Sequence, residues 1–166
     1  MASASTYVPI ANQVLTTATA SVTFSSISSA YTDLVLVCNH RGVTGSAGNG
    51  LYVTLNGDTG ANYSDTGLTG NGSAASSGRD TNLTAYYVGA GSVATEYTNT
   101  NINFMNYANT TTYKTMLART SDAGLQARAS VGLWRNTSAI NSILVSYYGY
   151  NFDAGSTFTL YGILAA

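Results

Sequence analysis

The sequence predicts an all-β protein, an antiparallel β-sandwich of jelly-roll type with about ten strands. Three observations support this prediction. β-Branched and aromatic residues alternate with small polar ones, glycine and asparagine interrupt these runs, and no stretch has the spacing of an amphipathic helix. Two antiparallel sheets that face each other would bury the alternating sides of such strands.

The expected strands follow one another along the chain at spacings typical of a sandwich or barrel. They are Tyr7 to Ile10, Ser21 to Phe24, Asp33 to Asn39, Leu51 to Leu55, Thr81 to Val88, Thr100 to Tyr107, Lys114 to Thr120, Leu125 to Trp134, Ile140 to Tyr148 and Thr157 to Leu164. The apolar positions in these strands predict a core of Leu34, Leu36, Val53, Phe104, Leu133, Trp134, Ile143, Phe158 and Leu160.

Three segments carry more specific predictions. Asp33 to Asn39 is almost continuously apolar, which predicts a strand in mid-sheet that is buried on both faces. Asn56-Gly57 follows an alternating strand and predicts a two-residue hairpin. Asp58 to Arg79 is rich in glycine and poor in apolar residues, so it predicts a long loop or a frayed edge.

The composition predicts a protein that packs against neighbours. Charged residues make up 8% of the 166 positions, with 17 glycines and 13 tyrosines, whereas an average soluble domain has about 25% charged residues. Hydroxyl and amide groups must therefore cover the surface, and a partner can bury them at lower cost than charges. Sheet edges with little charge to protect them also favour a homo-oligomer.

Several partners and compartments are not expected. The six Arg and Lys residues are scattered and the net charge is -1, so no basic stripe is available for nucleic acid. No apolar run is long enough to span a membrane, and residues 1–13 lack the basic and apolar regions of a secretory leader. The sequence therefore predicts synthesis in a cytoplasm, with Cys38 as a buried free thiol.

The sequence offers few residues for catalysis. His40 follows the apolar run and is expected at a strand end, facing solvent or capping a turn. No second histidine or cysteine lies at zinc-ligand spacing, and no GxSxG motif is present. Asn56, Asp58 and Asp65 supply oxygen ligands in one segment, but not at the spacing of an EF-hand loop. We expect no enzyme activity, no metal and no cofactor.

Tyrosines are the remaining candidates for a binding site. Tyr86 with its neighbour Tyr87, and the group Tyr147, Tyr148 and Tyr150, could form a platform on which sugar rings stack. The alternative interpretation is that some of these side chains face the core and the others line a subunit interface, where tyrosine is enriched. Interface or glycan contact is therefore predicted for Tyr86, Tyr147, Tyr148 and Tyr150.

Four segments resemble one known group of proteins. Asn106 to Thr120 (NYANTTTYKTMLART), Val131 to Val145 (VGLWRNTSAINSILV) and Asn151 to Ile163 (NFDAGSTFTLYGI) are similar to small virion structural proteins of tailed bacteriophages, common among cyanophages. Tyr7 to Val37 resembles the same group. The resemblance implies a β-sandwich, often trimeric, on the outside of a virus particle.

The expected function follows from this resemblance. A flexible arm at Met1 to Thr6 and a single domain over residues 7–166 leave no long shaft before the sandwich, which favours a free-standing module over a fibre. We therefore expect a capsid cement or decoration protein on the outer head surface, a homotrimer that contacts the major capsid protein. The alternative is a carbohydrate-binding receptor module of a tail or head fibre that recognises a host glycan.

Overall fold

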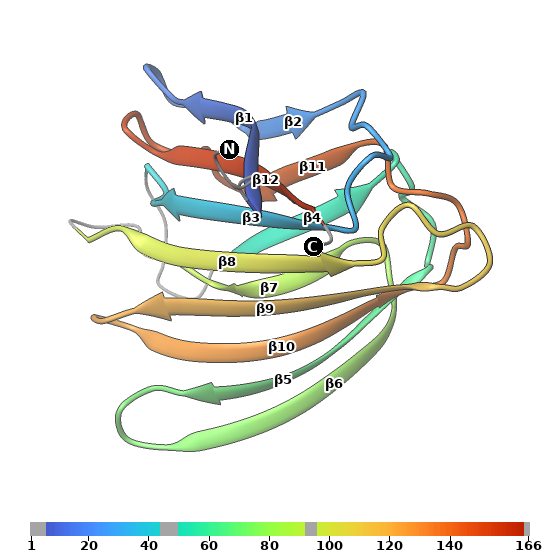
Figure 1. The fold of residues 1–166 in the computed structure, drawn as a ribbon. Coiled ribbons are helices and arrows are strands. Elements are labelled where there is room, and N and C mark those ends of the chain that lie inside the picture. The colour runs from blue at the N-terminus through green and yellow to red at the C-terminus, as the bar shows by residue number, and fades with distance from the viewer. Residues whose placement is uncertain (1–5, 44–49, 92–95, 165–166) are drawn as a thin grey trace.

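The structure, a computed structural model, describes residues 6–43, 50–91 and 96–164, and within them the protein is all-β with no helix (Figure 1). The expected arm at Met1 to Thr6 lies outside the described residues except for Thr6. The strands are β1 (Tyr7–Val14), β2 (Ser21–Phe24), β3 (Asp33–His40), β4 (Gly50–Leu55), β5 (Tyr63–Gly70), β6 (Ala75–Leu83), β7 (Tyr86–Ala90), β8 (Thr98–Met105), β9 (Lys114–Asp122), β10 (Gln126–Trp134), β11 (Ile143–Tyr147) and β12 (Thr157–Ile163).

The strands form an antiparallel sandwich of two unequal sheets. The large sheet has eight strands in the order β1-β12-β3-β8-β9-β10-β5-β6, and the small sheet has the order β2-β11-β4-β7. Without the hairpins β5–β6 and β9–β10, eight strands remain in two sheets, β1-β12-β3-β8 and β2-β11-β4-β7. Consecutive strands then pass from one sheet to the other, except β4 and β7, which pair within the small sheet; this is the jelly-roll order and confirms the predicted fold class.

The two inserted hairpins lengthen the large sheet beyond the jelly roll, and we call these four strands, β9, β10, β5 and β6, the extension. In Figure 1 the extension continues the large sheet past β8, with β6 as its free edge. From the small sheet, β7 packs on β9, β10 and β5. Every residue of β6 from Ala75 to Asn82 is exposed, so the large sheet ends in a strand that no other element covers.

The prediction of a loop for Asp58 to Arg79 is wrong, because most of this segment forms β5 and the start of β6. Strand patterns based on apolar alternation miss β5 because one inward position is a buried carboxylate, Asp65, and another is Gly67. The alternative of a frayed edge is closer to the structure for β6, which is the edge strand of the large sheet.

Two predicted connections also differ from the structure. Asn56 and Gly57 have positive φ angles of 52° and 69°, as the turn prediction requires, but β4 and β5 lie in different sheets and do not pair. The turn is therefore a corner between sheets. The single strand expected at Thr81 to Val88 is in fact the end of β6 and the start of β7, again in different sheets.

The core between the sheets contains the predicted residues with one exception. Leu34, Leu36, Val53, Phe104, Trp134, Ile143, Phe158 and Leu160 are fully buried. Leu133 is only partly buried, because its neighbour Trp134 takes the inward position at the end of β10. The central strand β3 lies between β12 and β8 as predicted, and Cys38 within it is a buried free thiol whose pKa is raised by burial.

Candidate functional site

The outer face of the extension, which points away from the small sheet, exposes apolar side chains at neighbouring positions. Leu117 in β9 pairs with Val131 in β10, and Val131 pairs with Thr66 in β5. Leu117 is 41% exposed and Val131 40%. Leu68, two residues along β5 from Thr66, is 65% exposed. A monomer seldom leaves a contiguous apolar patch uncovered without a reason, so this face is the first candidate surface.

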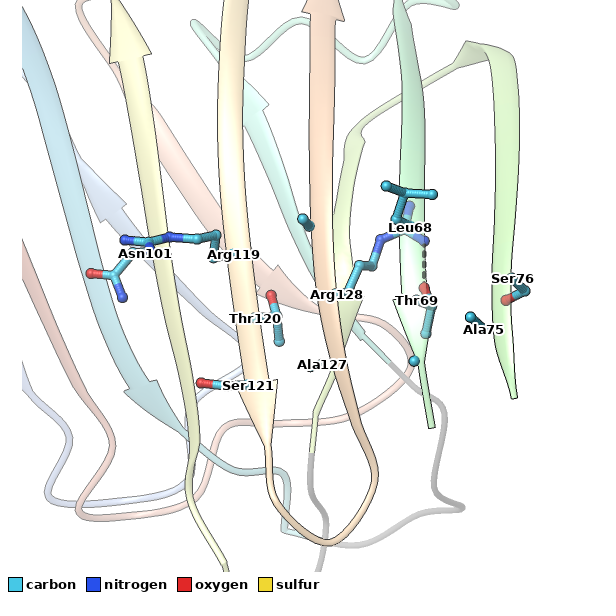
Figure 2. A pocket seen from close by; sticks show the side chains of 12 residues that line it. Leu68, Thr69, Ala75, Ser76, Asn101, Arg119, Thr120, Ser121, Ala127 and Arg128 are labelled. Atoms are coloured by element: carbon cyan, nitrogen blue, oxygen red, sulfur yellow. Dashed lines mark hydrogen bonds between the residues drawn. The ribbon is translucent and has the colours of Figure 1, made fainter. Parts of the chain in front are cut away.

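This outer face is hollowed. Two adjoining hollows of about 710 and 470 Å³ share Leu68, Arg119 and Ala129 in their linings. Figure 2 shows the larger one, with Arg119 extending toward Asn101 on one side and Leu68 standing on β5 on the other. The outward positions between them carry small side chains, and the hollow exists because long residues flank short ones.

The charged side chains of the hollowed outer face are two exposed arginines, Arg119 in β9 and Arg79 in β6, which lies opposite Thr66. Among the described residues, no carboxylate, histidine or cysteine lines either hollow. Arg119 is exposed and forms no salt bridge within the described part of the chain. Such a face has apolar groups, hydroxyls, amides and two arginines, which suits binding to another surface better than it suits acid, base or nucleophilic chemistry.

A second candidate surface lies on the other side of the large sheet, near the edge of the small one. The rings of Tyr52 and Tyr87 have centroids 5.2 Å apart, and those of Tyr52 and Tyr148 are 5.6 Å apart, with tilted planes. Tyr148 is 66% exposed, and the other two are partly buried. We call these three residues the tyrosine cluster; they come from β4, β7 and the turn after β11.

A buried ion pair of the extension supports one end of the tyrosine cluster. The guanidinium of Arg128 donates to Asp65 with an N–O distance of 2.5 Å, and its central carbon lies 4.9 Å from the centroid of the Tyr87 ring. A side chain on Gly67 would overlap the guanidinium, since an added Cβ would be 2.2 Å from it. The glycine therefore leaves the space that the arginine fills.

The ion pair and its neighbour Asp80 together carry excess negative charge, because two carboxylates face one guanidinium. Burial raises the pKa of Asp65, the nearby Arg128 charge lowers it in part, and Asp80 raises it further. Asp80 is the direct cross-strand partner of Asp65 and is exposed. Burial also raises the pKa of Tyr52, followed by the effects of the neighbouring tyrosines and of both carboxylates. The phenol of Tyr52 thus lies within the electrostatic reach of Asp65 and Asp80.

The four tyrosines predicted as contact residues differ in how deeply they are buried. Tyr86 is buried with its hydroxyl 2.7 Å from the Ser130 hydroxyl, and Tyr147 is buried and donates to the Gly91 carbonyl at 2.8 Å. Burial raises the pKa of Tyr86 and of Tyr147 to about 12. Tyr150 is partly buried against the core. The prediction of contact residues is therefore wrong for buried Tyr86 and Tyr147, and only Tyr148 is well exposed.

Sequence reasoning missed Tyr52 as a site residue, although the sequence contained a usable signal. Tyr52 lies between Leu51 and Val53 in an alternating strand whose Leu51, Val53 and Leu55 are buried. Its phase in the strand therefore placed it on the outer side of the small sheet. No comparable signal pointed to Tyr148 as its neighbour, because that contact depends on the pairing of β4 with β11.

His40 is buried rather than exposed, which contradicts the expectation of a solvent-facing strand end. Its ring has no exposed surface and packs edge-on against Tyr147 and Phe152. Nε2 lies 3.2 Å from the Thr100 hydroxyl. Burial lowers the pKa of His40 to about 3, so the imidazole is neutral at ordinary pH. It is part of the core of the jelly roll.

The oxygen ligands considered for calcium do not come together. The Asp58 carboxylate accepts hydrogen bonds from the Trp134 indole at 2.7 Å and from the Gly60 amide at 2.9 Å, and the indole bond is the largest cause of the lowered pKa of Asp58. Asp65 pairs with Arg128 instead. Within residues 6–43, 50–91 and 96–164, no three His, Cys, Asp or Glu side chains are grouped to hold a metal.

The described residues include no helix of the length and hydrophobicity required to cross a bilayer.

Comparisons with known proteins give little further information. No protein-family model matches the chain, and no curated protein matches it in sequence. Among solved structures it is similar to a native heptameric SAP-like pentraxin from Limulus polyphemus, with 11% identity and a TM-score of 0.21 over 94% of this chain and 89% of the pentraxin. Function must therefore be inferred from the two surfaces themselves.

Proposed function

We propose that the protein is a structural component of a bacteriophage virion that decorates the head and cements neighbouring capsid subunits. The observation that carries this proposal is the hollowed outer face of the extension, where Leu68, Leu117 and Val131 are exposed on a surface with few charges and no carboxylate in its hollows. The proposed occupant is a protein of the particle surface, the major capsid protein. The sequence resemblance to virion proteins supports the same assignment.

The chemistry of the outer face fits a protein partner. Small outward residues such as Ala127 and Ala129 let a partner side chain approach the sheet closely. Leu68 offers a large apolar group for a partner pocket, and burial of such anchors provides much of the affinity of an interface. Arg119 supplies one cation that a partner carboxylate can pair with, which would fix the orientation of binding.

A homotrimer is part of the proposal. Three copies would present three such faces, and simultaneous attachment raises the effective affinity without any new kind of contact. Because the face has few charges, we expect binding to depend weakly on salt. Particles that lack the protein should release their DNA at a lower temperature than complete particles, at low and at high salt.

The test compares two exposed aliphatic residues at opposite ends of the large sheet. Leu68→Asp puts a charge into the hollow. Val14→Asp puts the same charge at the end of β1, where Val14 is 57% exposed. We expect the first variant to lose co-sedimentation with particles that lack the protein and the second to retain it. Equal binding by both variants would refute this interface. Labelling only at the tail tip, with unchanged head stability, would favour the fibre alternative.

A further inference from the structure

We propose that the tyrosine cluster together with Asp80 forms a carbohydrate-binding site for neutral pyranose sugars. This site differs from the surface proposed above in both position and ligand. It lies on the side of the large sheet that faces the small sheet, whereas the hollows lie on the outer face. Tyr148 and Asp80 line neither hollow, so variants at these two residues test the site without altering the outer face.

The aromatic part of the site is a continuous ring surface. Tyr148 is 66% exposed, and its neighbour Tyr52 is followed by Tyr87 at ring spacings of 5.6 and 5.2 Å. One face of a pyranose ring consists of C–H groups, which pack on an aromatic ring as an apolar surface does. Tyrosine suits this contact because it combines an apolar ring with a polar hydroxyl, and the sugar also has both kinds of group.

The polar part of the site is the inward side of the β5–β6 hairpin. Asp80 is exposed, and within the described residues its carboxylate makes no ion pair or hydrogen bond. An ionised carboxylate has two acceptor oxygens, which can accept from two adjacent sugar hydroxyls. Asp80 pairs directly with Asp65 across β5 and β6, and Asp65 binds the Arg128 guanidinium. That guanidinium lies 4.9 Å from the Tyr87 ring centroid, so the Asp80 carboxylate lies toward the Tyr87 end of the cluster. Ring and acceptor thus lie near each other, as a sugar requires.

The charge balance of the site selects against acidic sugars. Asp65 and Asp80 are direct partners across β5 and β6, and among the described side chains the one cation paired with either is Arg128, which binds Asp65. One uncompensated negative charge therefore remains. A sialic acid or a uronic acid would bring a second anion close to it, and like charges at short range oppose binding.

Arg128 is expected to act as a positioning residue in this site. Its guanidinium lies against the Tyr87 ring at 4.9 Å and is held by Asp65, so it fixes the orientation of one ring of the cluster. The supporting strands β4, β7 and β5 are held in the two sheets, and the β4–β7 register shifts between Leu51 and Tyr52. Groups that are held in place before the ligand arrives lose less entropy on binding.

The test uses defined oligosaccharides and matched variants of the full chain. Maltotetraose, mannotetraose and chitotetraose serve as neutral probes, and sialyllactose and tetragalacturonate as acidic ones, with binding measured by ligand-observed NMR and calorimetry. We expect at least one neutral probe to bind and both acidic probes to bind more weakly. Tyr148→Ala and Asp80→Asn should each weaken that binding about tenfold or more.

The control is Tyr113→Ala, which removes a tyrosine that is 54% exposed and outside the cluster. This variant should bind the sugar as the wild type does. Failure of every neutral probe to bind, preferential binding of the acidic probes, or equal loss in Tyr113→Ala and Tyr148→Ala would each overturn the proposal. Unchanged circular dichroism of the Tyr148→Ala and Asp80→Asn proteins would show that their loss is not caused by unfolding.

Discussion

The jelly roll and the extension differ in how completely their side chains are buried. The eight strands of the jelly roll face each other across a core of side chains such as Phe104 and Phe158 that have no exposed surface. The extension is covered only in part: β7 of the small sheet packs on β9, β10 and β5, and β6 is exposed along almost its whole length. The outer face belongs to the extension, whereas the tyrosine cluster comes from the small sheet of the jelly roll and meets extension residues at one end.

The largest effect is expected in the jelly roll. Phe158→Ala removes a ring that is completely buried and packed against Phe152, with centroids 4.8 Å apart. Loss of such a ring costs about 3–5 kcal/mol of unfolding free energy, through lost burial and the cavity left behind. Urea denaturation measures the difference. A change as small as that of an exposed residue in β6 would remove the contrast between the two regions.

The ion pair of the extension should behave differently from the apolar core. Arg128→Met leaves the Asp65 carboxylate buried without its cation, which we expect to cost about 3 kcal/mol. In the double variant Asp65→Leu with Arg128→Met, stability should return close to that of the wild type. Buried Asp65 Oδ1 and Arg128 Nε find no hydrogen-bond partner among the described residues, so the pair is incompletely satisfied. Denaturant unfolding of both variants tests this, and a double variant as unstable as the single one would contradict it.

Two glycines of the extension should respond with opposite signs. An added Cβ at Gly132 would be 2.6 Å from the Tyr86 ring that anchors β7 on β10, so Gly132→Ala should cost about 1–3 kcal/mol. At Gly78 in the uncovered strand β6, an added Cβ meets nothing within 4 Å. Gly78→Ala should therefore stabilise the protein slightly, because alanine loses less backbone entropy. Thermal unfolding can compare the two, and equal effects would show that β7 does not constrain the extension.

Buried His40 should make the unfolding free energy of the protein depend on pH. The pKa of His40 is about 3 in the fold and near 6.5 in the unfolded chain, so between these values the unfolded state binds more protons. The contribution of neutral His40 to the unfolding free energy is therefore fully present above about pH 6.5. It falls as the pH drops toward 3, by at most about 1.4 kcal/mol per pH unit. His40→Asn, which keeps a group that can bond Thr100, should have a flatter profile. An identical slope in both proteins would assign the effect to carboxylates instead.

The contrast between jelly roll and extension also explains which parts of the fold the sequence could predict. Core strands of the large sheet such as β3 and β12 alternate or run apolar because the small sheet covers one of their faces, and that pattern is visible residue by residue. The strand β5 has Asp65 and Gly67 at inward positions, since the residue they accommodate is Arg128 from β10. Nothing local to β5 reveals that partner, and a loop was the natural prediction.

The candidate sites show the same limit. The low charge of the chain and its many tyrosines predicted a surface suited to binding, but not which tyrosines would be exposed. Tyr147 and Tyr148 are adjacent in sequence, yet the first points into the core and the second out of it. The hollows of the outer face depend on Leu68 and Arg119, which come from different hairpins and lie on one face only after the sheet has formed.

The sequence alone determined the all-β class, most strand positions and most of the core, because alternation and turn residues are local consequences of which side of a strand is buried. Only the tertiary structure decided the order of strands in each sheet. That order depends on contacts between residues far apart in the chain, such as Asp65 with Arg128 and Tyr52 with Tyr148. Both proposed binding surfaces are products of that order.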